Sequence, residues 1–255
     1  MDTPDDGFEH EDDGYTPPDS INFSALPAAL RGLELFDDPY LSMQATNLGI
    51  VDEFCTSLEA GVLSTYYTDN ANRLPEAIFL SAQSQMWIMS AYELVRTWRQ
   101  RAKEAIKWAD NGGLPTKIGD LRKDVGFRHN GRLIRADQLQ RLIDQPSKVD
   151  KIRLDLRRIH MAFERMHLLR ISLAKHEVAG ANEIAVAPGY GRINMWNGAI
   201  DFELSRGRFI LGTLSRRDVA DELRAIAVNP PPTEEEMESF DAWISGPLPS
   251  DLDIP

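Results

Sequence analysis

SKVDKIRLDLRRIHMAFERMHLLRISLAKHEV, residues 147–178, is the stretch that decides the fold. Apolar side chains recur in it every seven residues, in one series of Val149, Leu156 and Phe163 and a second of Ile152, Ile159, Met166 and Leu173. This spacing predicts one long amphipathic helix whose apolar stripe faces a core. The first series continues at Arg170, a cation that needs partners or a wet cleft, because burying an unpaired charge is costly.

Two further helices are expected before this stretch, over residues 40–66 and 75–109. The second is rich in large apolar side chains, so we expect it at the centre of the fold, and Asn111-Gly112-Gly113 should end it. Cys55 falls within the first helix and is expected to be a small core residue rather than a nucleophile. Residues 114–146 should form shorter helices and loops.

The pattern changes after residue 180, where three short strands are expected over residues 192–196, 199–204 and 208–214. Asn197-Gly198 between the first two strands predicts a two-residue type I′ turn. Ser/Thr-x-x-acid patterns predict helix starts at Ser147, Ser215 and Thr233. The start at Ser215 opens a closing helix that ends near residue 228.

The sequence therefore predicts a mainly α protein, an antiparallel helical bundle with a small C-terminal β-meander and a closing helix. We expect a disordered acidic tail over residues 1–24 and a bundle domain over residues 25–180. The meander and closing helix, residues 181–228, should pack on the bundle, before an acidic Pro-rich tail over residues 229–255.

Charge is distributed unevenly along the 255 residues, whose formal net charge is −12. Residues 1–20 hold 8 acidic residues and no Lys or Arg, and residues 229–255 hold 7 and none, so the body between them carries +3. The tails either shield a basic surface from other ligands or simply keep the protein in solution. No apolar run is long enough to span a bilayer, and the first residues lack the features of a secretory signal, so a cytoplasmic location is expected.

Motifs for metal and cofactor chemistry are incomplete. Glu164 and His167 have the Glu-x-x-His spacing of di-iron bundles, but the chain has no second such pair. The glycine-rich run Pro188–Arg192 lacks the Lys-Ser/Thr ending of a phosphate-binding loop, and no Gly-x-Ser-x-Gly motif is present. We therefore expect no metal and no cofactor.

Arg170-Ile-Ser-Leu-Ala-Lys-His176 resembles the signature of the HEPN family, an Arg followed after four to six residues by a His near the end of the last long bundle helix. The resemblance covers about residues 40–180. It implies a homodimer and a metal-independent ribonuclease of a toxin–antitoxin or defence type, in which Arg170 stabilises a phosphate and His176 assists proton transfer. Imidazole and guanidinium suit these roles chemically.

Further cations are candidates for holding RNA phosphate or a nucleotide: Arg96, Arg99, Lys175, Arg192, Arg216 and Arg217. One alternative is a regulator that binds a nucleotide through the last three of these. Another is a non-enzymatic interaction or scaffold protein, in which exposed Trp and Met side chains dock a protein partner and Arg170 forms a structural ion pair with an acid such as Glu93. The sequence leaves open whether the protein is an enzyme.

Overall fold

The structure is a computed structural model that describes residues 15–69, 74–126, 130–174, 191–206 and 209–246. Its helices are η1 (Pro18–Ser20), α1 (Ala25–Arg31), α2 (Pro39–Asp69), α3 (Leu74–Asp110), α4 (Leu114–Arg122), α5 (Asn130–Asp144), α6 (Ser147–Arg158), α7 (His160–Ala174), α8 (Arg216–Ala225) and α9 (Glu234–Ser245). Its strands are β1 (Gly191–Ile193), β2 (Ile200–Arg206) and β3 (Phe209–Ser215). The predicted fold class, a helical bundle with a small antiparallel sheet and a closing helix, is confirmed.

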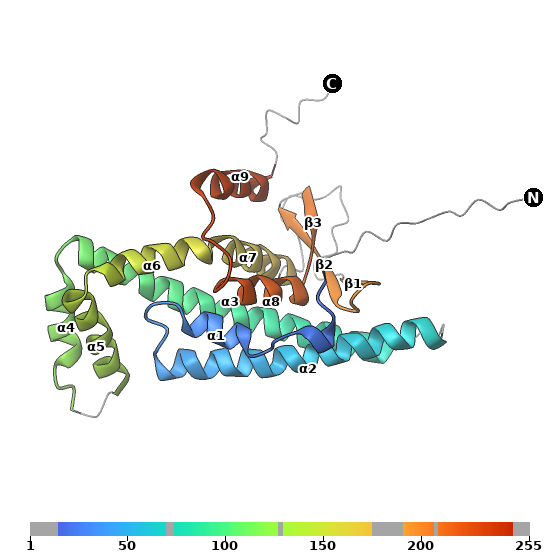
Figure 1. The fold of residues 1–255 in the computed structure, drawn as a ribbon, viewed down its shortest axis with the longest axis horizontal. Helices are drawn as coiled ribbons and strands as arrows, with labels where there is room; N and C mark the ends of the chain where they lie inside the picture. The colour runs from blue at the N-terminus through green and yellow to red at the C-terminus, as the bar shows by residue number, and fades with distance from the viewer. Residues whose placement is uncertain (1–14, 70–73, 127–129, 175–190, 207–208, 247–255) are drawn as a thin grey trace, which may run out of the picture.

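Helix α3 is the central element of the bundle, as its many large apolar residues predict. It contacts α2, α4, α5, α6, α7, α8 and β2. Helix α2 lies beside it along the lower edge of the molecule, with α1 on one flank (Figure 1). One side of the α2–α3 pair is therefore placed to face outward.

The predicted long helix over residues 147–178 is wrong in one respect, because the chain turns at Ile159 and forms two helices, α6 and α7. Both halves pack on α3, but α6 also packs on α5, whereas α7 also packs on α8, α9 and β2. The apolar stripe itself is confirmed: Val149, Ile152, Ile159, Phe163 and Met166 are all buried. The start predicted at Ser147 is not capped by its side chain, because Pro146 takes the cap position.

The three strands form an antiparallel meander in the order β1-β2-β3. Alternate side chains of β2, namely Ile200, Phe202 and Leu204, are buried, and β2 packs on α7. The two-residue turn predicted at Asn197-Gly198 is wrong, since Ile193 pairs with Ile200 and a longer connection joins the strands. Only the glycine of that dipeptide has a positive φ, of 75°.

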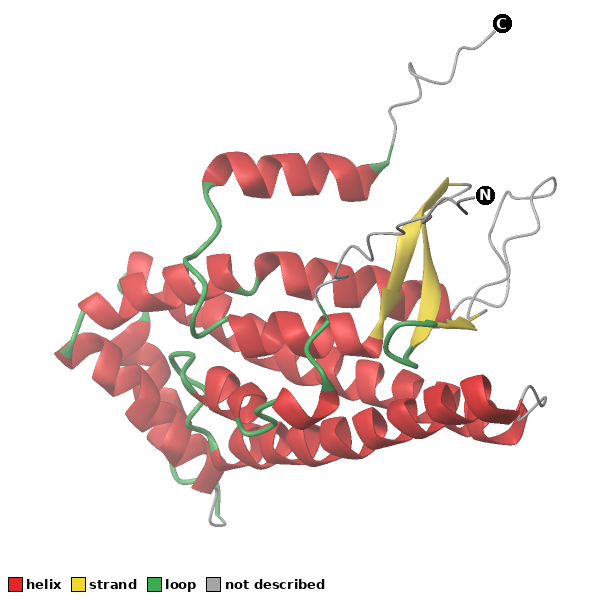
Figure 2. Ribbon diagram, turned by 45° about the vertical axis from the view of Figure 1, so that its right-hand side comes forward, coloured by secondary structure: helices red, strands yellow, loops and turns green. Residues whose placement is uncertain are grey.

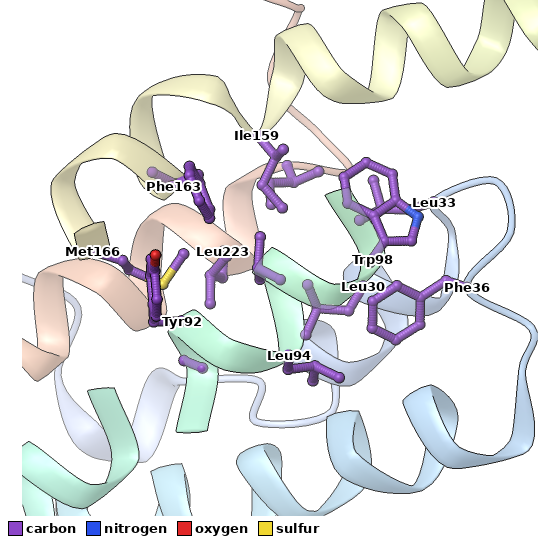
Figure 3. Packing of buried hydrophobic residues seen from close by; sticks show 14 of the residues in the cluster. Leu30, Leu33, Phe36, Tyr92, Leu94, Trp98, Ile159, Phe163, Met166 and Leu223 are labelled. Carbon is purple, nitrogen blue, oxygen red and sulfur yellow. The ribbon is translucent and has the colours of Figure 1, made fainter. Parts of the chain in front are cut away.

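The hydrophobic core joins the helical layers and the sheet. Figure 3 shows part of it, with Trp98, Phe163, Met166 and Leu223 contributed by α3, α7 and α8. Residues of α1 and the connection after it, Leu30 and Phe36 among them, fill the same core, although the sequence did not predict α1. Cys55 is fully buried, as expected of a core residue.

The two other predicted helix starts are confirmed. Ser215 and Thr233 each form a capping box, with Asp218 and Glu236 respectively. Helix α9, within the segment expected to be a tail, runs alongside α7 (Figure 2). Its Phe240 is buried and contacts His160 and Arg165 of α7. In the parts of the chain that the structure describes, no helix is both long and apolar enough to cross a membrane.

Residues 15–24, which the sequence places in the N-terminal tail, have defined contacts with α8. The hydroxyl of Tyr15 donates a hydrogen bond to Asp218 at 3.1 Å, and the carbonyl of Thr16 accepts one from Arg217. This segment is therefore bound to the folded body.

Candidate functional site

Arg216 and Arg217, predicted as phosphate ligands at the start of α8, lie inside the core. Their exposed fractions are 0% and 1%. The side chain of Arg216 reaches α2, where its Nε donates to Glu59 at 2.9 Å and its terminal nitrogens bond Asp52, Thr56 and Glu59. The Arg216 guanidinium also lies over the Trp87 ring, 5.6 Å from its centroid.

The buried ionic network of α2 and α8, which we define as Asp52, Glu59, Arg216, Arg217, Asp221 and Arg224, balances its charges. Arg217 approaches Glu59 at 3.5 Å and Asp221 at 3.4 Å, and Arg224 bonds both Asp52 and Asp221. Three guanidinium groups thus meet three carboxylates, which is the condition for burying charge without a large cost. Burial raises the pKa of Glu59, and the charges of Arg216 and Arg217 oppose that rise.

This network corrects the expectation that Arg216 and Arg217 meet phosphate at a helix start. An anion there would have to displace carboxylates that are themselves inaccessible to solvent. The sequence misled because an Arg-Arg pair in the first turn of a helix is usually solvated, and nothing near it in the chain indicates partners on a helix about 160 residues earlier.

The two predicted phosphate ligands on α3, Arg96 and Arg99, are paired with carboxylates. Arg96 is exposed and bonds Glu93 at 2.8 Å through its Nε. Arg99 is largely buried, donates to Glu164 at 2.8 Å, and lies 4.0 Å from the centroid of the Phe163 ring. These contacts hold α3 against α7 and leave little of Arg99 for another ligand.

Arg170 packs on an aromatic stack between α3 and α7. Its guanidinium lies 5.3 Å from the centroid of Tyr92, and the rings of Tyr92, Phe163 and His167 stack on one another. Glu93, the acid expected as a partner of Arg170, bonds Arg96. A hydrogen bond of 3.0 Å joins Nδ1 of His167 and the Tyr92 hydroxyl. Lys175 and His176, the other predicted residues of this motif, lie outside the described residues.

Arg192, the last predicted phosphate ligand, is on β1. Its side chain is 72% exposed and lies 3.7 Å from Glu203. The described members of the predicted site therefore occupy four separate places: the outer side of α3, the seam between α3 and α7, strand β1 and the core. The structure does not bring them together in one cleft.

A polar cavity of about 590 Å³ lies between the sheet, α7 and α8, and Tyr15, Arg165, Asp201 and Asp218 line it. Burial, with a further contribution from Asp218, raises the pKa of Asp201 to about 6, although the amide of Asn194 donates to its carboxylate. Burial and Asp218 also raise the pKa of Tyr15. The polar groups of this cavity mainly bond one another.

A groove of about 610 Å³, lined by apolar and uncharged polar side chains, runs between α2 and α3. On α2 it is lined by Tyr40, Gln44, Asn47, Leu48 and Val51, and on α3 by residues that include Met86, Trp87, Met89 and Leu94. Glu93 is its one charged lining residue among those described, and that carboxylate already bonds Arg96. The Trp87 indole forms the floor, with its Nε1 donating to the Leu48 carbonyl at 2.9 Å.

Large apolar side chains flank this groove and are about half exposed. They are Tyr40, Met43, Ile50 and Phe54 on α2 and Ile78, Phe79 and Met86 on α3, with exposed fractions from 47% to 63%. Met43, Ile50 and Phe54 are spaced by seven and four residues, so they share one face of α2. The groove and these seven flanking side chains together form what we call the α2–α3 face.

The α2–α3 face was not predicted from the sequence, because α2 buries polar side chains as well as apolar ones such as Leu41, Leu48 and Cys55. Its inward side carries Asp52, Thr56 and Glu59, all buried, whereas Ile50 and Phe54 are exposed. The acidic residues at the centre of an otherwise nearly uncharged helix were the signal that a polar side faces inward.

Within the described ranges, no group of three or more His, Cys, Asp or Glu side chains is arranged to hold a metal ion. Comparisons with models of protein families, with curated proteins and with solved structures find no match to this chain.

Proposed function

We propose that this protein is a non-enzymatic interaction module that binds a protein partner through the α2–α3 face. The observation that carries the proposal is an almost uncharged groove between two long helices, which seven half-exposed large apolar side chains line or flank. Single exposed apolar residues are ordinary on protein surfaces, but contiguous apolar patches of several hundred Å² mark interaction sites.

The chemistry of the face also fits protein recognition. Interface cores are depleted in charge and enriched in aromatic and Met side chains, and this face offers Tyr40, Phe54, Phe79, Met43 and Met86. Met side chains adapt their shape to a partner. A groove between two helices is moreover the usual receptor for an amphipathic helix, which would insert its apolar side chains between α2 and α3.

RNA or nucleotide binding, and HEPN-type cleavage by Arg170 and His176, stay predictions of the sequence. The interaction module is favoured over them because Arg216 and Arg217 are buried and Arg96 and Arg99 are paired with carboxylates. A cytoplasmic location is part of the proposal.

Photo-crosslinking in cells tests the interaction proposal. A photoreactive amino acid replaces Met86, at the groove, and in a matched control it replaces Leu133 of α5, which is 49% exposed and outside the groove. A discrete polypeptide adduct at position 86 that is absent at position 133 is the expected result. Equal adducts at both positions, or none at either, would refute the proposal.

A further inference from the structure

We infer that the partner docked on the α2–α3 face is a second copy of this chain, which forms a two-fold dimer whose core is a four-helix bundle. This inference rests on the proposed function, since it names the occupant of the same face. Three properties of the face support it: its area, its shape and its charge.

The area matches what a stable dimer needs. A large side chain buries 150–250 Å², so seven that are about half exposed present roughly 700 Å² in total. A standard interface buries about 800 Å² on each partner. The rest of the groove lining, which includes the polar Gln44, Asn47 and Gln83, brings the α2–α3 face to about that size.

The shape of the face is self-complementary. Met43, Asn47, Ile50, Phe54 and Ser57 are all exposed and follow the alternating spacing of four and three residues that forms the seam between packed helices. The groove runs beside this ridge on the same helix, because Gln44, Asn47 and Val51 line it. In a two-fold contact the same patch serves both copies, so the ridge of each copy can enter the groove of the other.

The charge of the face favours a second copy over a foreign partner. Helix α2 contains no Lys or Arg, and two of its acids, Asp52 and Glu59, are buried in the ionic network, which leaves Glu53 as an exposed carboxylate beside the face. Glu93 is paired with Arg96 at the rim. Two copies of a neutral face meet without like-charge repulsion, whereas specificity for a foreign protein generally uses charges that complement those of the partner.

The mass of the purified full-length protein in solution tests the inference. Light scattering after gel filtration is measured at about 5 and about 200 µM, because interfaces of standard size have dissociation constants of micromolar or below. We expect a mass near twice 28.7 kDa. Ile50→Glu and Met86→Glu each place a carboxylate in the interface and should raise the dissociation constant on the order of 100-fold, and Leu133→Glu should leave it unchanged. Circular dichroism confirms that each variant is folded.

Each outcome decides between the two proposals. A monomer at about 200 µM overturns the second copy, and a heterologous adduct at position 86 would then leave the interaction module standing. A dimer that Ile50→Glu and Met86→Glu do not weaken overturns the assignment of this face. Loss of dimer in these two folded variants, with the dimer intact in Leu133→Glu, supports it.

Discussion

Arg216→Met tests whether the buried ionic network holds α8 to α2. Methionine keeps most of the side-chain volume, so the change removes the charge rather than opening a large cavity. Removing one partner of a buried ion pair costs about 3–5 kcal/mol. Here Arg224 still reaches Asp52 and Arg217 still reaches Glu59, so each carboxylate keeps one cation and the lower figure, about 3 kcal/mol, applies.

The assay is thermal unfolding followed by circular dichroism at pH 7.5. For a chain of this size each kcal/mol lowers the melting temperature by about 2–4 °C, so Arg216→Met should lower it by about 6–12 °C. The matched control is Arg122→Met, because the Arg122–Asp137 pair is 47% and 66% exposed and should contribute less than about 1 kcal/mol. Arg216→Lys keeps the charge and should lose less stability than Arg216→Met. If Arg216→Met melts within about 2 °C of the unmodified protein, the reasoning about this network is refuted.

Three further predictions concern single residues. Gly198→Ala should destabilise the fold by at least about 2 kcal/mol, because φ is 75° and a Cβ there would lie 2.1 Å from the Glu59 carbonyl oxygen. In the control Gly61→Ala the Cβ meets nothing within 4 Å, so this variant should not be destabilised. Equal melting temperatures of the two variants would contradict this prediction. Burial raises the pKa of Asp201 to about 6, so the folded protein favours the protonated carboxyl. The stabilising contribution of that protonation is full below about pH 4 and is lost as the pH rises through about 6. Because Asp201 is partly exposed, the loss is about 1 kcal/mol. Asp201→Asn should therefore melt about 2–4 °C higher than the unmodified protein at pH 7.5, and at the same temperature at pH 4. Equal melting temperatures of the two proteins at both pH values would be evidence against this prediction. Burial raises the pKa of Cys55 to about 11, so a thiol reagent at pH 8 should label Cys55 in urea but not in the folded protein, and rapid labelling without urea would exclude a buried thiol.

The helical framework could be predicted because it follows local periodicity. The bounds expected for the first two long helices, 40–66 and 75–109, agree with α2 and α3 to within a few residues. The capping box at Ser215 and the order of the three strands follow from short motifs in the same way. These features depend on neighbours in sequence, which a reader of the sequence can see.

Features that depend on distant contacts could not be predicted. The turn at Ile159 interrupts a regular heptad pattern, because α6 and α7 pack on different partners. Gly198 lies against the carbonyl of Glu59, which imposes a longer connection than the Asn-Gly dipeptide indicates. Arg216 finds its carboxylates on α2. Each case is a long-range contact that overrides a local preference.

Long-range contacts also decided which predicted site residues are available to a ligand. Cations were expected to mark a phosphate site, but their partners are carboxylates brought close by the fold, as Glu164 is to Arg99. The exposed apolar face is the converse case, since Ile50 and Phe54 look like core residues in the sequence. Which side of a helix faces inward is settled by its neighbours, and α2 buries Asp52 and Glu59 because α8 supplies three guanidinium groups.

Oxidation of side chains by hydroxyl radicals tests most directly whether the α2–α3 face is covered by a second copy. Met43 and Met86 are 52% and 56% exposed on the single chain, and Trp196 and Trp243, away from the face, are 57% and 43% exposed. In the full-length protein at about 200 µM, both methionines should oxidise about fivefold more slowly than in Ile50→Glu, because an interface core excludes water, and both tryptophans should oxidise equally in the two proteins. Equal oxidation of Met43 and Met86 in the two proteins would contradict the account.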